Sequence, residues 1–149
     1  MTKVQPTTNE SVRSESEELR EQHLTQTPIE HILQKLSCLE LPAKEHFERY
    51  MRHKWRLNHK PKTLASSFTS VMLFLGFCGK SGKKDLDEIE RVDLEAFIEH
   101  EQDRGMHIST VRTRLACIIA FLHFLIEQDV ITGSLLKRSI KLKLPDILP

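Results

Sequence analysis

The chain has 149 residues, a formal net charge of +1, 39% hydrophobic residues, five glycines and three cysteines. This length indicates one domain, and the apolar content is enough to form a core. The balanced charge excludes a strongly basic protein, so a binding surface for a charged partner has to come from the local distribution of charge.

Few glycines, few β-branched runs and almost no alternation of apolar and polar residues predict an all-α fold. The three cysteines, Cys38, Cys78 and Cys117, are far apart in the sequence. We interpret them as buried or half-buried residues of helices in a reducing compartment. We find no charged-then-apolar leader and no apolar run that looks long enough to span a bilayer. We therefore expect a cytoplasmic protein that does not act in a membrane.

Residues 1–26 contain few aliphatic residues and are predicted to form a disordered tail. Thr27 to Glu30 then spell a capping box with proline at the first helical position. This pattern predicts an additional N-terminal helix to about Leu39, within residues 27–41. A further helix is expected over residues 42–57, and its inward residues would be Phe47, Tyr50, Met51 and Trp55.

The stretch from Ser109 to Glu127 has the longest helical periodicity in the chain, with Ser109 expected as its N-cap. The helix that follows a break at residues 58–61 repeats this design. When Thr63 is aligned with Thr110, apolar residues fall over apolar residues, and both helices begin polar and end apolar. Small helical bundles often contain similar helices, so the pattern alone leaves ordinary bundle packing equally open.

Residues 79–84 are predicted to form a loop with solvated lysines, and residues 92–104 a shorter helix that is closed by Gly105. A final short helix is expected over residues 134–142. Residues 144–149 contain two prolines and read as the beginning of a linker. The folded domain would therefore occupy residues 42–143.

Charge is sorted by segment along the chain. Residues 44–62 carry seven Lys or Arg against two Glu, whereas residues 85–103 carry nine acidic residues and one Arg. Basic residues return in the stretch that contains Arg112 and Arg114. A solvated surface is the simplest explanation of each run taken singly. The basic runs, however, coincide with the polar starts of the two similar helices.

The polar starts of these helices suit a phosphate-bearing ligand. A helix N-terminus has free amides and a partial positive charge, which favour phosphate oxygens. Short Ser and Thr side chains allow close approach, and Arg112 and Arg114 flank the polar face of the second helix. This combination is typical of a helix end that enters the major groove of DNA.

Other chemistry finds little support in the sequence. Two H-x-x-R sequences, at His46 and His53, lie on one predicted helix among core aromatic residues. The histidines lack the four-residue spacing of zinc ligands on a helix, and residues 79–84 lack the spacing of a phosphate-binding loop. We therefore predict no catalytic residue, no metal site and no cofactor in this chain.

From about Ala43 onward, the sequence resembles the N-terminal core-binding (SAM-like) domain of tyrosine recombinases of the phage-integrase type. The resemblance rests on the order and spacing of several short motifs. The matching residues are Phe47, Tyr50, Met51, Lys60, Pro61, Lys62, Thr63, Leu64, Leu73, Phe74, Leu75, Leu86, Ile89, Val92, Asp93, Leu94, Phe97, Ile98, Arg104, Gly105, Ile108, Ser109, Thr110, Val111, Leu115, Ile118, Phe121, Phe124, Leu125 and the final Leu-Pro pairs.

The resemblance implies a bundle of four or five helices that forms one half of a clamp on duplex DNA. The helices that begin at Thr63 and Ser109 would enter the major groove. It also implies that strand exchange through a phosphotyrosine belongs to a catalytic domain, which these residues do not include. The partners implied are double-stranded DNA, further recombinase protomers on that DNA, and the catalytic domain.

The predicted DNA-binding residues are the hydroxyl-bearing residues at the two helix starts and the cations around them. They are Lys60, Lys62, Thr63, Ser66, Ser67, Ser70, Ser109, Thr110, Arg112, Thr113, Arg114, Lys137, Arg138, Lys141 and Lys143. The alternative is a helical protein-interaction module that engages a partner through the acidic helix or the N-terminal helix. A third possibility, an intact recombinase, differs from the first by sequence beyond residue 149.

Overall fold

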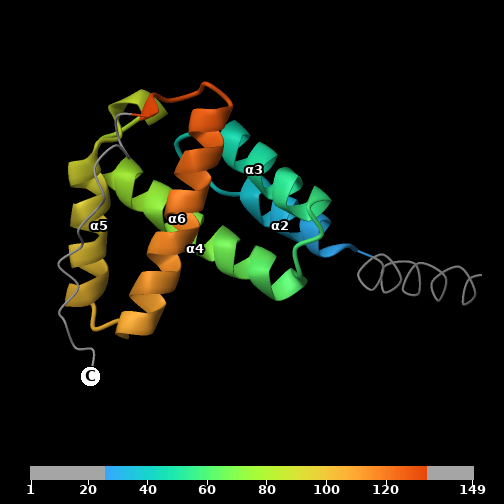
Figure 1. Cartoon of the computed structure of the whole chain (residues 1–149), viewed down its shortest axis with the longest axis horizontal. Coiled ribbons are helices and arrows are strands. Elements are labelled where there is room, and N and C mark those ends of the chain that lie inside the picture. Colours follow the sequence, from blue (N-terminus) through green and yellow to red (C-terminus); the bar gives the residue numbers. More distant parts are fainter. Residues whose placement is uncertain (1–25, 134–149) are drawn as a thin grey trace, which may run out of the picture.

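Five α-helices and one short 3-10 helix make up residues 26–133, the part of the chain that the computed structural model describes (Figure 1). No strand occurs in this range, which confirms the predicted all-α bundle. The predictions for the tail, the final short helix and the linker lie outside the described residues. So do those for four of the predicted DNA-binding cations, Lys137, Arg138, Lys141 and Lys143.

Helix α2 spans Pro28–Ser37 and begins with the predicted capping box. Thr27 Oγ1 accepts a hydrogen bond from the Glu30 amide at 3.3 Å, and Glu30 Oε2 accepts one from the Thr27 amide at 3.2 Å. The helix ends at Ser37 rather than near Leu39, with Cys38 as its C-cap. Three apolar side chains on one face, Ile29, Ile32 and Leu36, attach α2 to the core.

Two helical hairpins form the rest of the bundle. The first hairpin joins α3 (Lys44–Arg56) to α4 (Pro61–Lys80), and the second joins α5 (Arg91–Asp103) to α6 (Ile108–Glu127). Helices α3 and α5 each contain 13 residues, and α4 and α6 each contain 20. The 3-10 helix η1, Leu86–Glu88, lies in the connection between the hairpins. The alignment of Thr63 with Thr110 therefore holds for the whole of α4 and α6 and extends to α3 and α5.

The two hairpins also turn in the same way. Asn58 (φ 61°) and Gly105 (φ 79°) occupy equivalent left-handed positions after the first helix of each hairpin. The next amide closes each turn, from His59 to the Lys54 carbonyl at 3.3 Å and from Met106 to the Glu101 carbonyl at 3.2 Å. A left-handed residue after a helix lets the chain satisfy carbonyls that have no partner within the helix. The structure thus contains an internal repeat of helix, turn and helix.

Aromatic side chains join the two hairpins in one core. The ring of Phe121 on α6 lies 6.0 Å from that of Phe47 and 5.2 Å from that of Tyr50, both on α3. The ring of Phe74 on α4 lies 5.6 Å from that of Phe97 on α5. All of these residues are buried, which confirms the prediction that Tyr50 is a core residue. Each hairpin therefore covers apolar surface that the other would expose.

Equivalent positions in α3 and α5 carry buried groups of opposite charge. Lys54 is 9% exposed, and its ammonium donates to the Tyr50 hydroxyl at 3.3 Å. Burial lowers the pKa of Lys54 from its usual value. Glu101, at the matching place in α5, is 1% exposed and forms ion pairs with Arg104 and Arg114.

The cysteines differ from one another in exposure. Cys78 is buried, and burial raises the pKa of its thiol to about 12, as expected for an unreactive structural residue. Cys117 is partly exposed. Cys38, at the end of α2, is exposed, so the prediction that every cysteine is at least half-buried is wrong there.

Several predicted boundaries need correction. Helix α6 begins at Ile108 with His107 as its N-cap, so Ser109 lies in the first turn instead of capping it. Helix α4 continues to Lys80, which shortens the predicted loop. The C-terminal half of α6, predicted as its apolar end, still exposes Ala120 and His123 to solvent. Trp55, predicted to face inward, is half-buried and packs against the core.

Helices α4 and α6 also correct the expectation about membrane-spanning segments. With 20 residues each and mean hydropathies of 1.2 and 1.5, both are long and apolar enough to cross a bilayer by length and composition alone. Their apolar side chains include Phe74, Leu75, Phe121 and Leu122, which are buried in the shared core. In the most apolar stretch of each helix, 44% is buried inside the bundle for α4 and 28% for α6.

Candidate nucleic-acid interface

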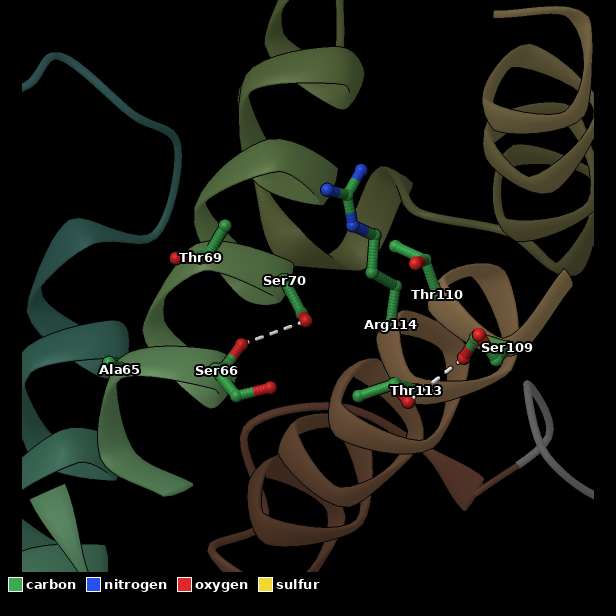
Figure 2. A pocket seen from close by; sticks show the side chains of 8 residues that line it. All are labelled: Ala65, Ser66, Thr69, Ser70, Ser109, Thr110, Thr113 and Arg114. Carbon is green, nitrogen blue, oxygen red and sulfur yellow. Dashed lines mark hydrogen bonds between the residues drawn. The ribbon is translucent and has the colours of Figure 1, made fainter. Parts of the chain in front are cut away.

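The N-terminal halves of α4 and α6 border a shallow cleft of about 390 Å³, here called the polar cleft. Figure 2 shows it between the two helices, with side chains of both directed toward it. Its lining residues are Ala65, Ser66, Thr69 and Ser70 of α4, and Ser109, Thr110, Thr113 and Arg114 of α6. The structure therefore brings together polar residues from the N-terminal halves of two helices that are far apart in the sequence.

The hydroxyl groups of the polar cleft differ in what they offer a ligand. Ser70 donates to the Ser66 carbonyl at 2.8 Å, and Thr113 donates to the Ser109 carbonyl at 2.9 Å. Their oxygens are therefore left as acceptors. Ser66, Thr69 and Thr110 have side-chain hydroxyls with no hydrogen bond within residues 26–133. These three hydroxyls are free to donate as well as to accept.

The two helix starts differ in how their first amides are used. At α4 the N-cap Lys60 makes no side-chain cap, and Pro61 has no amide hydrogen. The amides of Lys62 and Thr63 precede the first intrahelical hydrogen bond, which Leu64 donates to Lys60. At α6, by contrast, His107 Nδ1 accepts from the Ser109 amide at 3.2 Å. The start of α4 is thus the more open of the two to an anion.

Exposed cations lie beside both helix starts. Lys60, Lys62 and Arg112 are exposed, and none of them forms an ion pair within the described part of the chain. Thr63 is exposed at the first turn of α4. Because these ammonium and guanidinium groups are unneutralised, they give the first turns of both helices a positive charge.

Arg114 differs from these cations because its charge is already matched. Its guanidinium pairs with the buried carboxylate of Glu101 on α5, and its side chain is 14% exposed. Arg104 holds the other oxygen of the same carboxylate at 3.0 Å. Arg114 thus lines the polar cleft in a fixed orientation, and the sequence prediction of a DNA-binding Arg114 did not include its pairing with Glu101.

The remaining predicted residues do not all reach the surface. Ser67 is 1% exposed and donates to Cys117 Sγ at 3.9 Å. It therefore lies in the packing contact between α4 and α6 and not on the candidate DNA-binding surface. Ser70 lines the polar cleft but is 2% exposed. Both are small residues at the place where the two helices approach each other, which accounts for their burial.

Sequence reasoning missed two residues that shape the interface. Thr69 lines the polar cleft, and although helical spacing places it on the polar face with Ser66 and Ser70, it is absent from the predicted DNA-binding residues. Glu101 lies four residues after Phe97 on the buried face of α5, and a carboxylate in an apolar stripe indicates a buried partner. Only the tertiary structure identifies that partner as Arg114, because it lies on another helix.

Within residues 26–133, no group of three or more His, Cys, Asp or Glu side chains is placed to hold a metal ion. A family model described as "Phage integrase, N-terminal SAM-like domain" matches residues 45–129. The matched region contains both hairpins and leaves out α2. No curated protein and no solved structure matches the sequence significantly.

Proposed function

Because this chain belongs to the family of phage integrase N-terminal SAM-like domains, we propose that it binds duplex DNA as the clamp domain of a site-specific tyrosine recombinase. The observation that carries the proposal is the polar cleft itself, which is lined by hydroxyl-bearing residues from the N-terminal halves of two helices that both have exposed cations in their first turns. In this proposal the chain itself performs no chemistry. Strand exchange belongs to a catalytic domain, and the site of action is the cytoplasm.

The dimensions of the helix starts fit the major groove. That groove is about 12 Å wide and admits an α-helix, and a helix with its side chains is about 10–12 Å across. Short hydroxyl residues at Ser66, Thr69, Thr110 and Thr113 let the helices approach the base edges. The hydroxyls of Ser66, Thr69 and Thr110 can donate and accept, and that of Thr113 can accept, so they pair with many base edges and contribute modest sequence discrimination.

The cations and free amides are assigned to the phosphate backbone. Lys60 and Lys62 flank the open amides of α4, where the helix dipole favours an anion. Arg112 would hold phosphates beside α6. Lys137, Arg138, Lys141 and Lys143 are proposed to continue these contacts toward the linker. Arg114 contributes positive charge close to the bases, in the orientation that Glu101 imposes.

Salt dependence of duplex binding by the full chain tests the proposal. About five phosphate contacts correspond to a slope of about −4 to −5 in a plot of log affinity against log salt concentration. Arg112→Ala and Lys62→Ala should each reduce this slope by about one. The control is Lys35→Ala, because Lys35 is an exposed cation at the end of α2, outside the polar cleft. Fluorescence anisotropy with a labelled duplex measures the affinity of the unaltered chain and of all three variants at each salt concentration.

Undetectable binding at low ionic strength, or a slope that neither substitution changes, would refute the proposal. The protein-interaction alternative makes the opposite prediction. It requires that Arg112→Ala leave duplex binding unchanged while substitutions in the acidic α5 abolish capture of a partner.

A further inference from the structure

The solvent-facing side of α3 carries a row of arginines outside the polar cleft. Arg49, Arg52 and Arg56 are separated by three and four residues, so they share one helix face, opposite the buried Phe47 and Met51. All three are exposed, and none forms an ion pair or hydrogen bond within residues 26–133. We call these three residues the arginine stripe.

The matching face of α5 carries the opposite charge. The internal repeat places Glu99 at the position of Arg52, and Asp103 at the position of Arg56. Both carboxylates are exposed, and neither has a cationic partner in the described part of the chain. Glu95, one turn earlier on the same face, pairs with Arg91 of its own helix. Glu95, Glu99 and Asp103 form the carboxylate stripe.

We propose that the arginine stripe of one copy of this chain docks on the carboxylate stripe of a second copy. Helices α3 and α5, which carry the two stripes on their exposed faces, lie on opposite sides of α4 and α6 (Figure 1). They therefore cannot meet within one chain. Because the surfaces are different, the contact is heterologous, and each copy keeps one stripe available for a further copy.

The spacing of the charges supports a second copy of this chain, rather than an unspecified anion, as the partner of the arginine stripe. Arg52 and Arg56 are four residues apart, as are Glu95 and Glu99. An antiparallel arrangement of the two helices therefore sets Arg56 against Glu95, Arg52 against Glu99 and Arg49 against Asp103. It also directs the end of α3 toward the start of α5, where the two exposed large hydrophobic residues of the described range lie: Leu57, 58% exposed, and Val92, 64% exposed.

The contact is weak and depends on salt. Exposed ion pairs contribute little individually and are screened over a distance of about 8 Å at physiological ionic strength. Self-association through the stripes is therefore expected only at low ionic strength or at high local protein concentration. It requires no DNA, so it is measured separately from the proposed function.

Charge exchange between the stripes tests the proposal in sedimentation velocity experiments on the full chain without DNA. The unaltered chain should show a mass that rises with protein concentration at low salt and returns to that of the monomer at high salt. Arg52→Glu alone and Glu99→Arg alone should each weaken self-association about tenfold or more, because like charges then face each other. The matched controls Lys35→Glu and Glu40→Arg alter exposed residues outside both stripes and should change nothing.

Two combinations separate lost docking from lost folding. A mixture of the Arg52→Glu and Glu99→Arg chains should associate again, and so should the chain that carries both substitutions. Restoration of this kind cannot come from a chain that has failed to fold. A monomeric unaltered chain at low salt, or association that neither single substitution weakens, would overturn the proposal. So would an Arg52→Glu chain that loses duplex affinity but keeps its self-association, because the stripe would then be a phosphate-binding surface.

Discussion

Glu101 lies on the buried face of α5, four residues after Phe97, where an unpaired carboxylate would be strongly destabilising. The guanidinium groups of Arg104 and Arg114 neutralise it. Arg114 also lines the polar cleft, so this cluster connects the core to the candidate interface. A residue that contacts no ligand in our proposal thus determines where a cation of the interface points.

Removal of the Glu101 carboxylate should destabilise the whole domain. Glu101→Ala leaves Arg114, which is 14% exposed, without its counter-charge, and breaking a buried pair typically costs about 3–5 kcal/mol. Urea denaturation measures the change in the free energy of unfolding. Glu99→Ala, on the exposed face of the same helix, is the control and should stay within about 0.5 kcal/mol. A loss at Glu101 no larger than that of the control would contradict the role assigned to the pair.

At the scale of elements, the equivalent turns of the two hairpins predict which residues each position accepts. Gly105 has φ 79°, and a Cβ added there would meet no atom within 4 Å. The cost of a substitution is therefore conformational. Asn58 holds the same kind of left-handed conformation, at φ 61°, in the first hairpin.

Gly105→Asn should therefore be tolerated, whereas Gly105→Val should cost about 1–2 kcal/mol or more, because a β-branched residue fits this conformation poorly. Thermal unfolding of both variants measures the difference. The reverse exchange, Asn58→Gly, serves as the control in the first hairpin and should be close to neutral. Equal destabilisation by Asn and Val would show that the turns are not equivalent.

Local signals predicted most of the elements. Apolar periodicity located α3 to α6, the capping box at Thr27 located α2, and Gly105 marked the end of α5. The similarity of α4 and α6 was visible because both are apolar. That of α3 and α5 was hidden because their solvent-facing residues have opposite charges, as at Arg52 and Glu99.

The candidate site was predictable in its outline but not in its details. Polar starts with adjacent cations identified both helices that border the polar cleft. The sequence could not show that Ser67 turns into the helix contact, because helical spacing places it close to the residues that face outward. Nor could it show that Arg114 is paired, since Glu101 belongs to another helix and the pairing depends on how α5 packs against α6.

At the scale of the molecule, the two hairpins share one core and should unfold together. Phe121 of the second hairpin contacts Phe47 and Tyr50 of the first. Phe121→Ala should lower the free energy of unfolding by about 3–5 kcal/mol. Trp55, the single tryptophan, lies in the first hairpin. Its fluorescence therefore reports whether the loss of stability caused by a substitution in the second hairpin also affects the first hairpin.

The urea transition followed by Trp55 fluorescence should shift by the same amount as that followed by circular dichroism, as a single cooperative transition requires. His123→Ala is the control, because His123 is exposed on the same helix. A fluorescence transition that Phe121→Ala leaves in place would mean that the first hairpin is stable by itself.

The close approach of Ser67 and Cys117 has a mechanical consequence for the cleft. These two small residues mark the point where α4 and α6 cross, and both helices project beyond it to their N-termini. From Cys117 to Ile108 that projection is about 13 Å at 1.5 Å per residue, so a ~10° change in crossing angle moves the end by roughly 2 Å. A bulkier side chain at this pivot would therefore respace the two helix ends relative to a fixed ligand, although no atom of that ligand comes near the altered residue.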